Sequence, residues 1–212
     1  METQKTIKNR KPIVIALVLL AAIAVLTAVL LVVLTHLPEP ETPAPVYHFY
    51  PVNRSENIMD NAEYLALDRS VRYCADPDGY GVTEEITDEN RSEMDPQVRF
   101  LESFLRAVID GDNEAYRAFF REDLIAKKQV PIGFTQQMLY RMTIRFVAEM
   151  EPGEGEVSRR LYRLDYYIHR NNGTFRSDME SDVTRPQFAV VSEQPDGSFR
   201  IENLYVNTGY TK

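Results

Sequence analysis

Apolar residues follow one another without a break from Ile13 to Leu34, and this is the strongest pattern in the chain. The run contains no charged side chain, and Thr27 is its one polar residue. A helix of about 20 apolar residues crosses the hydrocarbon core of a bilayer, which is roughly 30 Å thick. The run therefore predicts a transmembrane helix over residues 13–35. It is expected to act only as a tether, because it offers no ionisable group for transport.

The charges on either side of this run predict its orientation. Residues 1–12 contain four basic side chains and one acidic side chain, whereas the proline-rich segment 37–45 carries only acids. By the positive-inside rule, we expect a cytoplasmic basic tail and an extracytoplasmic remainder. The run is longer than the apolar core of a signal peptide, which has about 7–15 residues, so an uncleaved anchor is favoured over a secretory signal. The prolines predict an extended stalk over residues 36–60.

Residues 61–94 alternate short apolar runs with turn residues, and we expect them to bridge the stalk and a folded domain. Tyr64–Leu67 has the composition of a short strand. Ser70–Cys74 and Val82–Ile86 flank a turn signal at Asp76–Gly81, and together they predict a β-hairpin. Because an isolated two-stranded hairpin is only marginally stable, this hairpin should pack against the domain that follows.

Helical signals begin at Asp95, which is placed to cap a helix that has Pro96 at its first position. Five apolar residues then recur at steps of three and four: Val98, Leu101, Phe104, Leu105 and Val108. Gly111 is expected to end this helix in the left-handed conformation. Asp112 is placed to cap a second, short helix from Glu114 to Phe120.

The period of the apolar pattern changes from 3.6 to 2 after residue 140. Before that point, Thr135 is a candidate cap for a third helix, Gln136–Tyr140. The alternating segments then predict about four antiparallel strands: Met142–Glu149, Tyr162–His169, Gln187–Ser192 and Phe199–Val206. In the last segment the apolar parity slips after Glu202, which predicts a β-bulge there. Helices followed by an antiparallel sheet make an α+β domain, with the helices on one face of the sheet.

The segment Phe100–Phe120, in which a helix ends in Gly-Asp and a short helix follows, resembles the opening of the nuclear transport factor 2-like superfamily. The resemblance covers residues 95–212 and implies a cone-like domain, in which the helices pack on a strongly curved sheet. The superfamily includes isomerases, dehydratases, binding domains and single-span assembly factors of secretion and conjugation machines. Fold-level resemblance alone does not decide among these functions.

Composition narrows the chemistry further. The chain has 32 acidic and 24 basic residues, and this acidic balance argues against a nucleic-acid partner. A single cysteine excludes an internal disulfide and a thiolate metal cluster. The three histidines lack neighbours at ligand spacing, so we expect no metal and no cofactor. Cys74–Glu85 matches part of a calcium-loop pattern, but a thiol at the first ligand position favours an ordinary turn.

A binding pocket, if the cone holds one, should be lined by aromatic side chains on the strands. The candidates are Tyr140, Phe146, Tyr166 and Phe188. An isomerase-like enzyme would add an Asp or Glu base, and no acid shares the predicted interior parity of these strands. The alternative interpretation is that these aromatics are plain core. Likewise, the charged loop that contains Arg176, Asp178, Glu180, Asp182 and Arg185 is expected to be a solvated surface.

These patterns together predict a single-pass membrane protein with its C-terminal domain outside the cell membrane. The expected function is non-catalytic binding, with the bilayer contacted through Ile13–Leu34 and a protein partner or a second copy of the chain contacted by the domain. Two alternatives stay open: a structural subunit of a secretion or conjugation assembly, and an exported isomerase- or dehydratase-like enzyme that uses the cone cavity.

Overall fold

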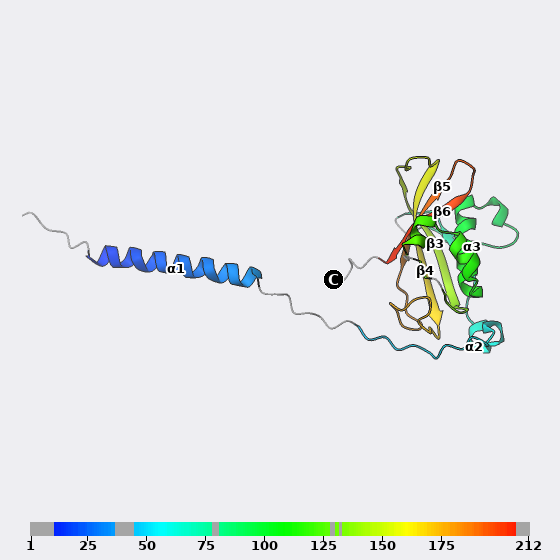
Figure 1. Cartoon of the computed structure of the whole chain (residues 1–212), viewed down its shortest axis with the longest axis horizontal. Coiled ribbons are helices and arrows are strands. Elements are labelled where there is room, and N and C mark those ends of the chain that lie inside the picture. Colours follow the sequence, from blue (N-terminus) through cyan, green and yellow to red (C-terminus); the bar gives the residue numbers. More distant parts are fainter. Residues whose placement is uncertain (1–10, 37–44, 78–80, 128–129, 132, 207–212) are drawn as a thin grey trace, which may run out of the picture. The chain divides into compact units, whose positions relative to one another are not determined.

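The computed structural model describes residues 11–36, 45–77, 81–127, 130, 131 and 133–206. The chain divides into two units, Met1–Pro45 and Val46–Lys212, and each is described by itself (Figure 1). The compact second unit thus begins at Val46, whereas the sequence places the start of the folded domain at Asp95. The expected bridge at residues 61–94 and the second half of the expected stalk belong to this unit.

The first unit contains one helix, α1, which spans Lys11–His36. Its stretch Ile15–Val32 is apolar, and none of its residues is buried. The hydroxyl of Thr27 donates to the carbonyl oxygen of Ile23 at 2.8 Å, so the one polar side chain of the run is satisfied within the helix. The helix is therefore long and apolar enough to span a membrane, as the sequence predicts.

The second unit is built on a six-stranded sheet with the order β2-β1-β3-β4-β5-β6. The strands are β1 (Val71–Cys74), β2 (Glu84–Glu85), β3 (Met138–Met150), β4 (Ser158–His169), β5 (Gln187–Glu193) and β6 (Phe199–Val206). The sequence predicts about four antiparallel strands, but the sheet also contains β1 and β2. The sheet is mixed rather than antiparallel throughout, because β1 pairs with β3 in parallel. The hairpin prediction itself is confirmed, since β1 and β2 are antiparallel and add to the sheet at β3.

The helices of the second unit precede most of the sheet. They are the 3-10 helices η1 (Ile58–Asp60) and η2 (Arg91–Glu93), and the α-helices α2 (Ala62–Leu65), α3 (Pro96–Asp110), α4 (Asn113–Ala118) and α5 (Glu122–Ala126). Two predictions were wrong. Tyr64–Leu67 is not a strand, because the side chain of Asn61 accepts a hydrogen bond from the amide of Tyr64 and starts α2. Gln136–Tyr140 is not a helix, because β3 begins at Met138, which pairs with His169.

The capping predictions for α3 and α4 are confirmed. Asp95 accepts a hydrogen bond from the amide of Gln97 at 2.8 Å, and Asp112 accepts one from the amide of Ala115 at 2.9 Å. Gly111 ends α3 with φ of 65°. A Cβ atom at Gly111 would lie 2.6 Å from the backbone nitrogen of Gln136, so both the conformation and the close approach require glycine.

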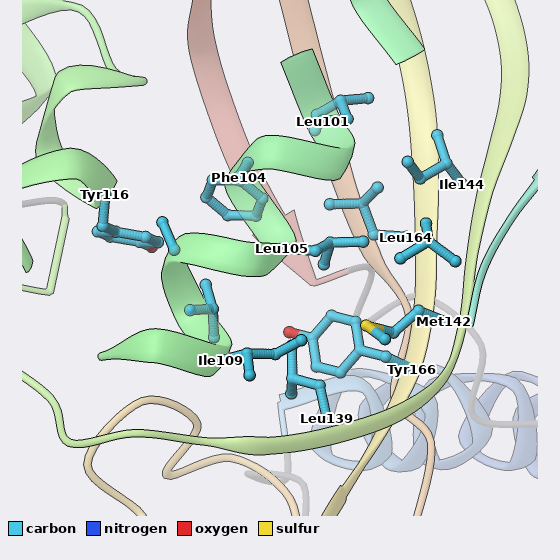
Figure 2. Packing of buried hydrophobic residues seen from close by; sticks show 14 of the residues in the cluster. Leu101, Phe104, Leu105, Ile109, Tyr116, Leu139, Met142, Ile144, Leu164 and Tyr166 are labelled. Atoms are coloured by element: carbon cyan, nitrogen blue, oxygen red, sulfur yellow. The ribbon is translucent and has the colours of Figure 1, made fainter. Parts of the chain in front are cut away.

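The core lies between α3 and one face of the sheet (Figure 2). The predicted stripe of α3 is buried, and so are the β4 residues Tyr162, Leu164, Tyr166 and Ile168, which share one parity. In β6 the partner of Val191 is Ile201 and the partner of Val190 is Asn203, which leaves Glu202 between them as an extra residue. The predicted bulge at Glu202 is thus confirmed, and it explains the parity slip.

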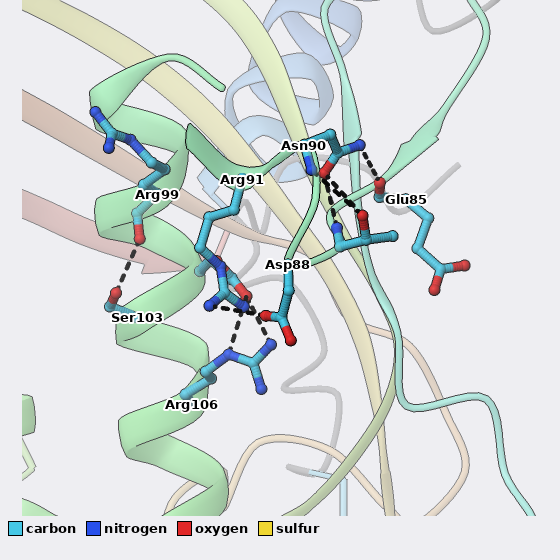
Figure 3. Close-up of polar contacts among 9 residues, drawn as sticks. Glu85, Asp88, Asn90, Arg91, Arg99, Ser103 and Arg106 are labelled. Carbon is cyan, nitrogen blue, oxygen red and sulfur yellow. Dashed lines mark hydrogen bonds and ion pairs between the residues drawn. The ribbon is translucent and has the colours of Figure 1, made fainter. Parts of the chain in front are cut away.

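A buried carboxylate joins the segment before α3 to that helix (Figure 3). Glu102 of α3 is buried, and its Oε1 lies 2.7 Å from guanidinium nitrogens of both Arg91 and Arg106. Asn90 donates to the carbonyl oxygen of Glu85 at 2.9 Å, which connects the same segment to β2. These contacts connect the segment that contains Asn90 and Arg91 to both β2 and α3.

Candidate functional site

The four aromatic candidates from the sequence lie on two different faces of the sheet. Phe146 pairs with Tyr162 in the sheet register, which places it with Tyr166 on the face that α3 covers. Tyr140 pairs with Tyr167, whose parity is opposite to that of Tyr166. Phe188 pairs with Arg163, which also has this opposite parity. The structure therefore does not bring the four residues into one pocket.

The two candidates on the face away from α3 have neighbours of their own. The ring of Phe188 stacks on that of Tyr205, with centroids 5.6 Å apart. The hydroxyl of Tyr140 donates to Oδ1 of Asp182 at 3.1 Å. Burial, followed by the nearby carboxylate of Asp182, raises the pKa of Tyr140 to about 12. Both aromatic side chains are thus held by pairwise contacts on a sheet surface.

Tyr166 has a different environment, because it belongs to a buried polar network. Its hydroxyl donates to Oε1 of Gln187 at 2.5 Å and accepts from Nη1 of Arg176 at 2.7 Å. Only 3% of Arg176 is exposed, so the expectation that its charged loop is solvated was wrong for this residue. Burial raises the pKa of Tyr166 to about 12, even though the charge of Arg176 acts in the opposite direction.

The charge of Arg176 is balanced by Asp178. Nε and Nη2 of Arg176 lie 2.6 Å and 2.8 Å from the two carboxylate oxygens, which is a bidentate pair. Nη2 also donates to the carbonyl oxygen of Arg185 at 3.0 Å. Burial disfavours the ionised form of Asp178, but the hydrogen bonds and charge of Arg176, with Arg185, outweigh it and lower the pKa of Asp178. Within the described chain, one of the five N–H groups of Arg176 has no acceptor.

Tyr116 on α4 is fully buried in a cage of aromatic rings. Its ring centroid lies between 4.9 Å and 5.8 Å from those of Phe104, Phe120, Phe134 and Phe175. Figure 2 shows Tyr116 beside Phe104 in this core. Its hydroxyl is buried and has no hydrogen-bond partner among the described residues. Burial raises the pKa of Tyr116 well above its ordinary value, so the hydroxyl keeps its proton and is a hydrogen-bond donor.

A groove of about 430 Å³ is lined in part by residues of this cage, and we call it the Tyr116 groove. Its apolar lining comes from Tyr116, Phe120, Leu124, Val130, Pro131, Phe175, Leu204 and Val206. Its polar lining comes from Arg176, Ser177, Asp178, Gln187 and Asn203. Small-molecule sites commonly combine a volume of roughly 300–1,000 Å³ with mostly apolar walls and a few polar groups. The Tyr116 groove has a volume in this range and a lining shared between apolar and polar groups, and Arg176 and Gln187 connect it to Tyr166.

A second recess of about 520 Å³, the polar cleft, lies between residues 50–58, the end of α3, residues 134–138 and residues 168–172. Its buried floor residue Gln137 donates to the carbonyl oxygen of Thr135 at 2.8 Å and to the hydroxyl of Thr174 at 3.1 Å. Charged side chains of both signs and a histidine line the cleft: Arg54, Glu56, Asp110, Arg170 and His169. The buried amide of Gln137 is therefore satisfied by the chain itself, whereas the buried Nε2 of His169 has no hydrogen-bond partner among the described residues and lies 3.5 Å from the carboxylate of Glu63.

Other chemistry that the sequence raises finds little support. Groups of three or more side chains suited to a metal ion do not occur among the described residues. Cys74, the first position of the calcium-loop pattern, is buried and accepts a hydrogen bond from Arg145 at 3.2 Å, while residues 78–80 of that pattern lie outside the described residues. The two ring nitrogens of His169 lie 3.3 Å from a carboxylate oxygen of Asp182 and 3.5 Å from one of Glu63.

The sequence did not single out Tyr116, and it assigned Arg176 to solvent. The opposite charges at positions 176, 178 and 185 are a sequence signal for ion pairs within the loop, and Asp178 does pair with Arg176 and Arg185. By contrast, nothing in the local sequence pattern marks Tyr116. The Tyr116 groove and the polar cleft are thus known from geometry alone. No protein-family model matches the chain, and no significant match was found among curated proteins or among solved structures.

Proposed function

We propose that the chain is a membrane-anchored, non-catalytic binding protein. In this proposal its domain is extracytoplasmic and holds a small, mostly apolar molecule with an oxygen acceptor in the Tyr116 groove. The anchor is supported by α1, and the orientation by the basic residues before it and the acidic segment after it. The resemblance to the nuclear transport factor 2-like superfamily is part of the same proposal, supported by the α3–Gly111–α4 arrangement ahead of the sheet.

The observation that carries the proposal is the buried hydroxyl of Tyr116, which finds no partner among the described residues. Leaving a buried hydroxyl without a hydrogen bond costs about 1–3 kcal/mol. A phenylalanine would keep the ring contacts with Phe104 and Phe134 and avoid this cost. A tyrosine at this position is explained if a bound molecule supplies the acceptor.

The neighbouring polar groups indicate the class of molecule. Arg176, which carries N–H donors only, lines the same groove as Tyr116, so the groove suits a molecule with an oxygen acceptor. The walls formed by Leu124, Val130 and Leu204 suit an apolar body. A carbonyl or carboxylate on a compact hydrocarbon frame matches this lining.

Binding is favoured over isomerase-like catalysis by the state of the acid in the groove. A general base near neutral pH needs a pKa raised toward 7. The acid that lines the groove, Asp178, instead has its pKa lowered, because the pair with Arg176 and Arg185 outweighs its burial. A carboxylate held in a bidentate pair is a poor proton acceptor.

Saturation-transfer NMR on the full chain in nanodiscs tests this proposal, with the water-soluble cyclohexanone and cyclohexanecarboxylate as probes. We expect transfer to either probe to exceed that of empty nanodiscs. Tyr116→Phe should weaken it by about three- to tenfold, which corresponds to one hydrogen bond. Leu204→Trp, which fills the groove, should abolish it, whereas Arg54→Met in the polar cleft should leave it unchanged. Equal signals from the wild-type chain and both groove variants would contradict the proposal.

A further inference from the structure

The domain carries an unusual uncharged segment at its start, Val46–Val52, which we call the aromatic strap. Its sequence is Val-Tyr-His-Phe-Tyr-Pro-Val, in a chain of which 26% is charged. Its apolar side chains face solvent: Val46 is 80% exposed and Tyr50 is 49% exposed, and Phe49 and Val52 are exposed as well. Large apolar side chains gathered on one exposed segment mark a surface that meets a partner or a membrane.

The aromatic strap is held against the domain by few contacts, and these fix its backbone. The amide of Tyr50 donates to the carbonyl oxygen of Asn171 at 2.9 Å. One side of the Phe49 ring packs on Gly173, where a Cβ atom would come within 2.9 Å of the ring. The guanidinium of Arg170 lies 6.0 Å from the centroid of the Tyr50 ring. The backbone is thus fixed while much of the side-chain surface remains uncovered.

The length of chain between α1 and the aromatic strap limits how far the strap can be from a membrane. α1 ends at His36, and Val46 follows ten residues later. Ten residues span at most about 35 Å, even when fully extended. If α1 crosses a bilayer, the strap is therefore confined to the neighbourhood of the surface from which α1 emerges.

The composition of the aromatic strap suits the boundary between lipid headgroups and acyl chains. Tyrosine rings are enriched at that boundary, because they have an apolar body and a polar tip. Valine and phenylalanine side chains gain free energy when they leave water. The aromatic strap contains no Asp, Glu, Lys or Arg. Insertion of its apolar side chains into the membrane therefore does not bury an ionised carboxylate, ammonium or guanidinium of the strap.

We propose that the aromatic strap inserts its exposed side chains into the interfacial layer of the membrane that α1 spans. This inference rests on the anchoring part of the proposed function, and is independent of the Tyr116 groove. The strap then makes a second attachment of the domain to the bilayer, in addition to the covalent tether.

The chain has no tryptophan, so a single introduced indole reports on its own surroundings. The test compares Val46→Trp with the matched control Val82→Trp, whose valine is 93% exposed and lies outside the aromatic strap. Both full-length variants are placed in nanodiscs with and without lipids brominated near the top of the acyl chain. We expect brominated lipid to reduce the Val46→Trp emission by about twofold and to leave that of Val82→Trp nearly unchanged.

Failure of the anchor and failure of the strap proposal are separable in this experiment. Release of the chain from nanodiscs by alkaline carbonate overturns the anchoring, and with it the basis of the strap proposal. A chain that stays incorporated, with Val46→Trp quenched no more than Val82→Trp, overturns the strap proposal alone. An indole that is shielded only as protein density on the membrane rises indicates a second copy as the occupant and also overturns it. Circular dichroism confirms that both variants are folded.

Discussion

The Tyr116 groove and the polar cleft differ less in size than in how their buried polar groups are satisfied. In the polar cleft, the buried amide of Gln137 donates to Thr135 and Thr174. In the Tyr116 groove, the buried hydroxyl of Tyr116 has no partner among the described residues. Nε2 of His169, which lines the polar cleft, is also buried without a hydrogen-bond partner among the described residues, but it lies 3.5 Å from the carboxylate of Glu63. The hydroxyl of Tyr116 is surrounded by aromatic rings instead, so a missing hydrogen-bond acceptor, rather than volume, distinguishes the Tyr116 groove.

The largest difference between the two recesses is expected in the free energy of unfolding when one arginine of each, Arg176 or Arg54, is replaced. Arg176→Met leaves Asp178 and Tyr166 without their buried partner, and should lower the free energy of unfolding by about 3–5 kcal/mol. The exposed Arg54 makes no ion pair within the described chain, so Arg54→Met should change the free energy of unfolding by less than about 0.5 kcal/mol. Urea unfolding of the full chain in detergent, followed by circular dichroism, measures both. Similar losses for both variants would contradict the contrast.

A smaller effect is expected from the floor of the polar cleft. Gln137→Met keeps the side-chain volume but removes the hydrogen bonds to Thr135 and Thr174 and leaves the carbonyl oxygen of Thr135 without its donor. The free energy of unfolding should fall by about 1–3 kcal/mol. The same urea titration measures this fall in the free energy of unfolding. An unchanged midpoint would show that the hydrogen bonds of Gln137 do not stabilise the domain.

The Tyr116 groove should also respond to pH. The lowered pKa of Asp178 means that its stabilising contribution is complete above the ordinary value of 3.8 and is lost as the pH falls through the lower folded-state value. A single carboxylate gives a slope of at most about 1.4 kcal/mol per pH unit in that window. Unfolding measured from about pH 6 down to about pH 2 should show this slope in the wild type, with a shallower one in Asp178→Asn. Equal slopes would contradict the role given to Asp178.

The smallest effect, and the one with the opposite sign, is expected at Tyr116. Without a ligand, Tyr116→Phe removes a buried hydroxyl that has no partner and should raise the free energy of unfolding by about 1 kcal/mol. A loss of stability from this substitution in ligand-free protein would show that the hydroxyl is already satisfied. Native mass spectrometry of the sample establishes that no small molecule is bound during the measurement.

Much of the fold could be predicted because it depends on local rules. The caps at Asp95 and Asp112, the left-handed Gly111 and the bulge at Glu202 each follow from a residue type and its immediate neighbours. The errors occurred where distant contacts decide the outcome. Met138 extends because it pairs with His169, and no property of residues 136–140 alone reveals that partner.

The candidate site was predictable only in part, for the same reason. Tyr166 was expected on the interior face, and it lies there. Tyr140 and Phe188 were grouped with it, but the irregular register between Tyr140 and Thr143 in β3 and the pairing of Phe188 with Arg163 place them on the other face. Side-chain alternation gives the parity within one strand, whereas the face depends on the register between strands.

The sequence by itself determined the apolar helix, the order of helices and strands, and the acidic, thiol-poor character of the domain, because these depend on composition and short-range periodicity. Tertiary structure alone decided which polar groups are buried together. It brought Arg176 from a charged loop to the hydroxyl of Tyr166, enclosed Tyr116 among four phenylalanines, and laid the aromatic strap beside Asn171 and Gly173. Burial and hydrogen-bond satisfaction are properties of contacts between distant segments, so they exist only once the chain has folded.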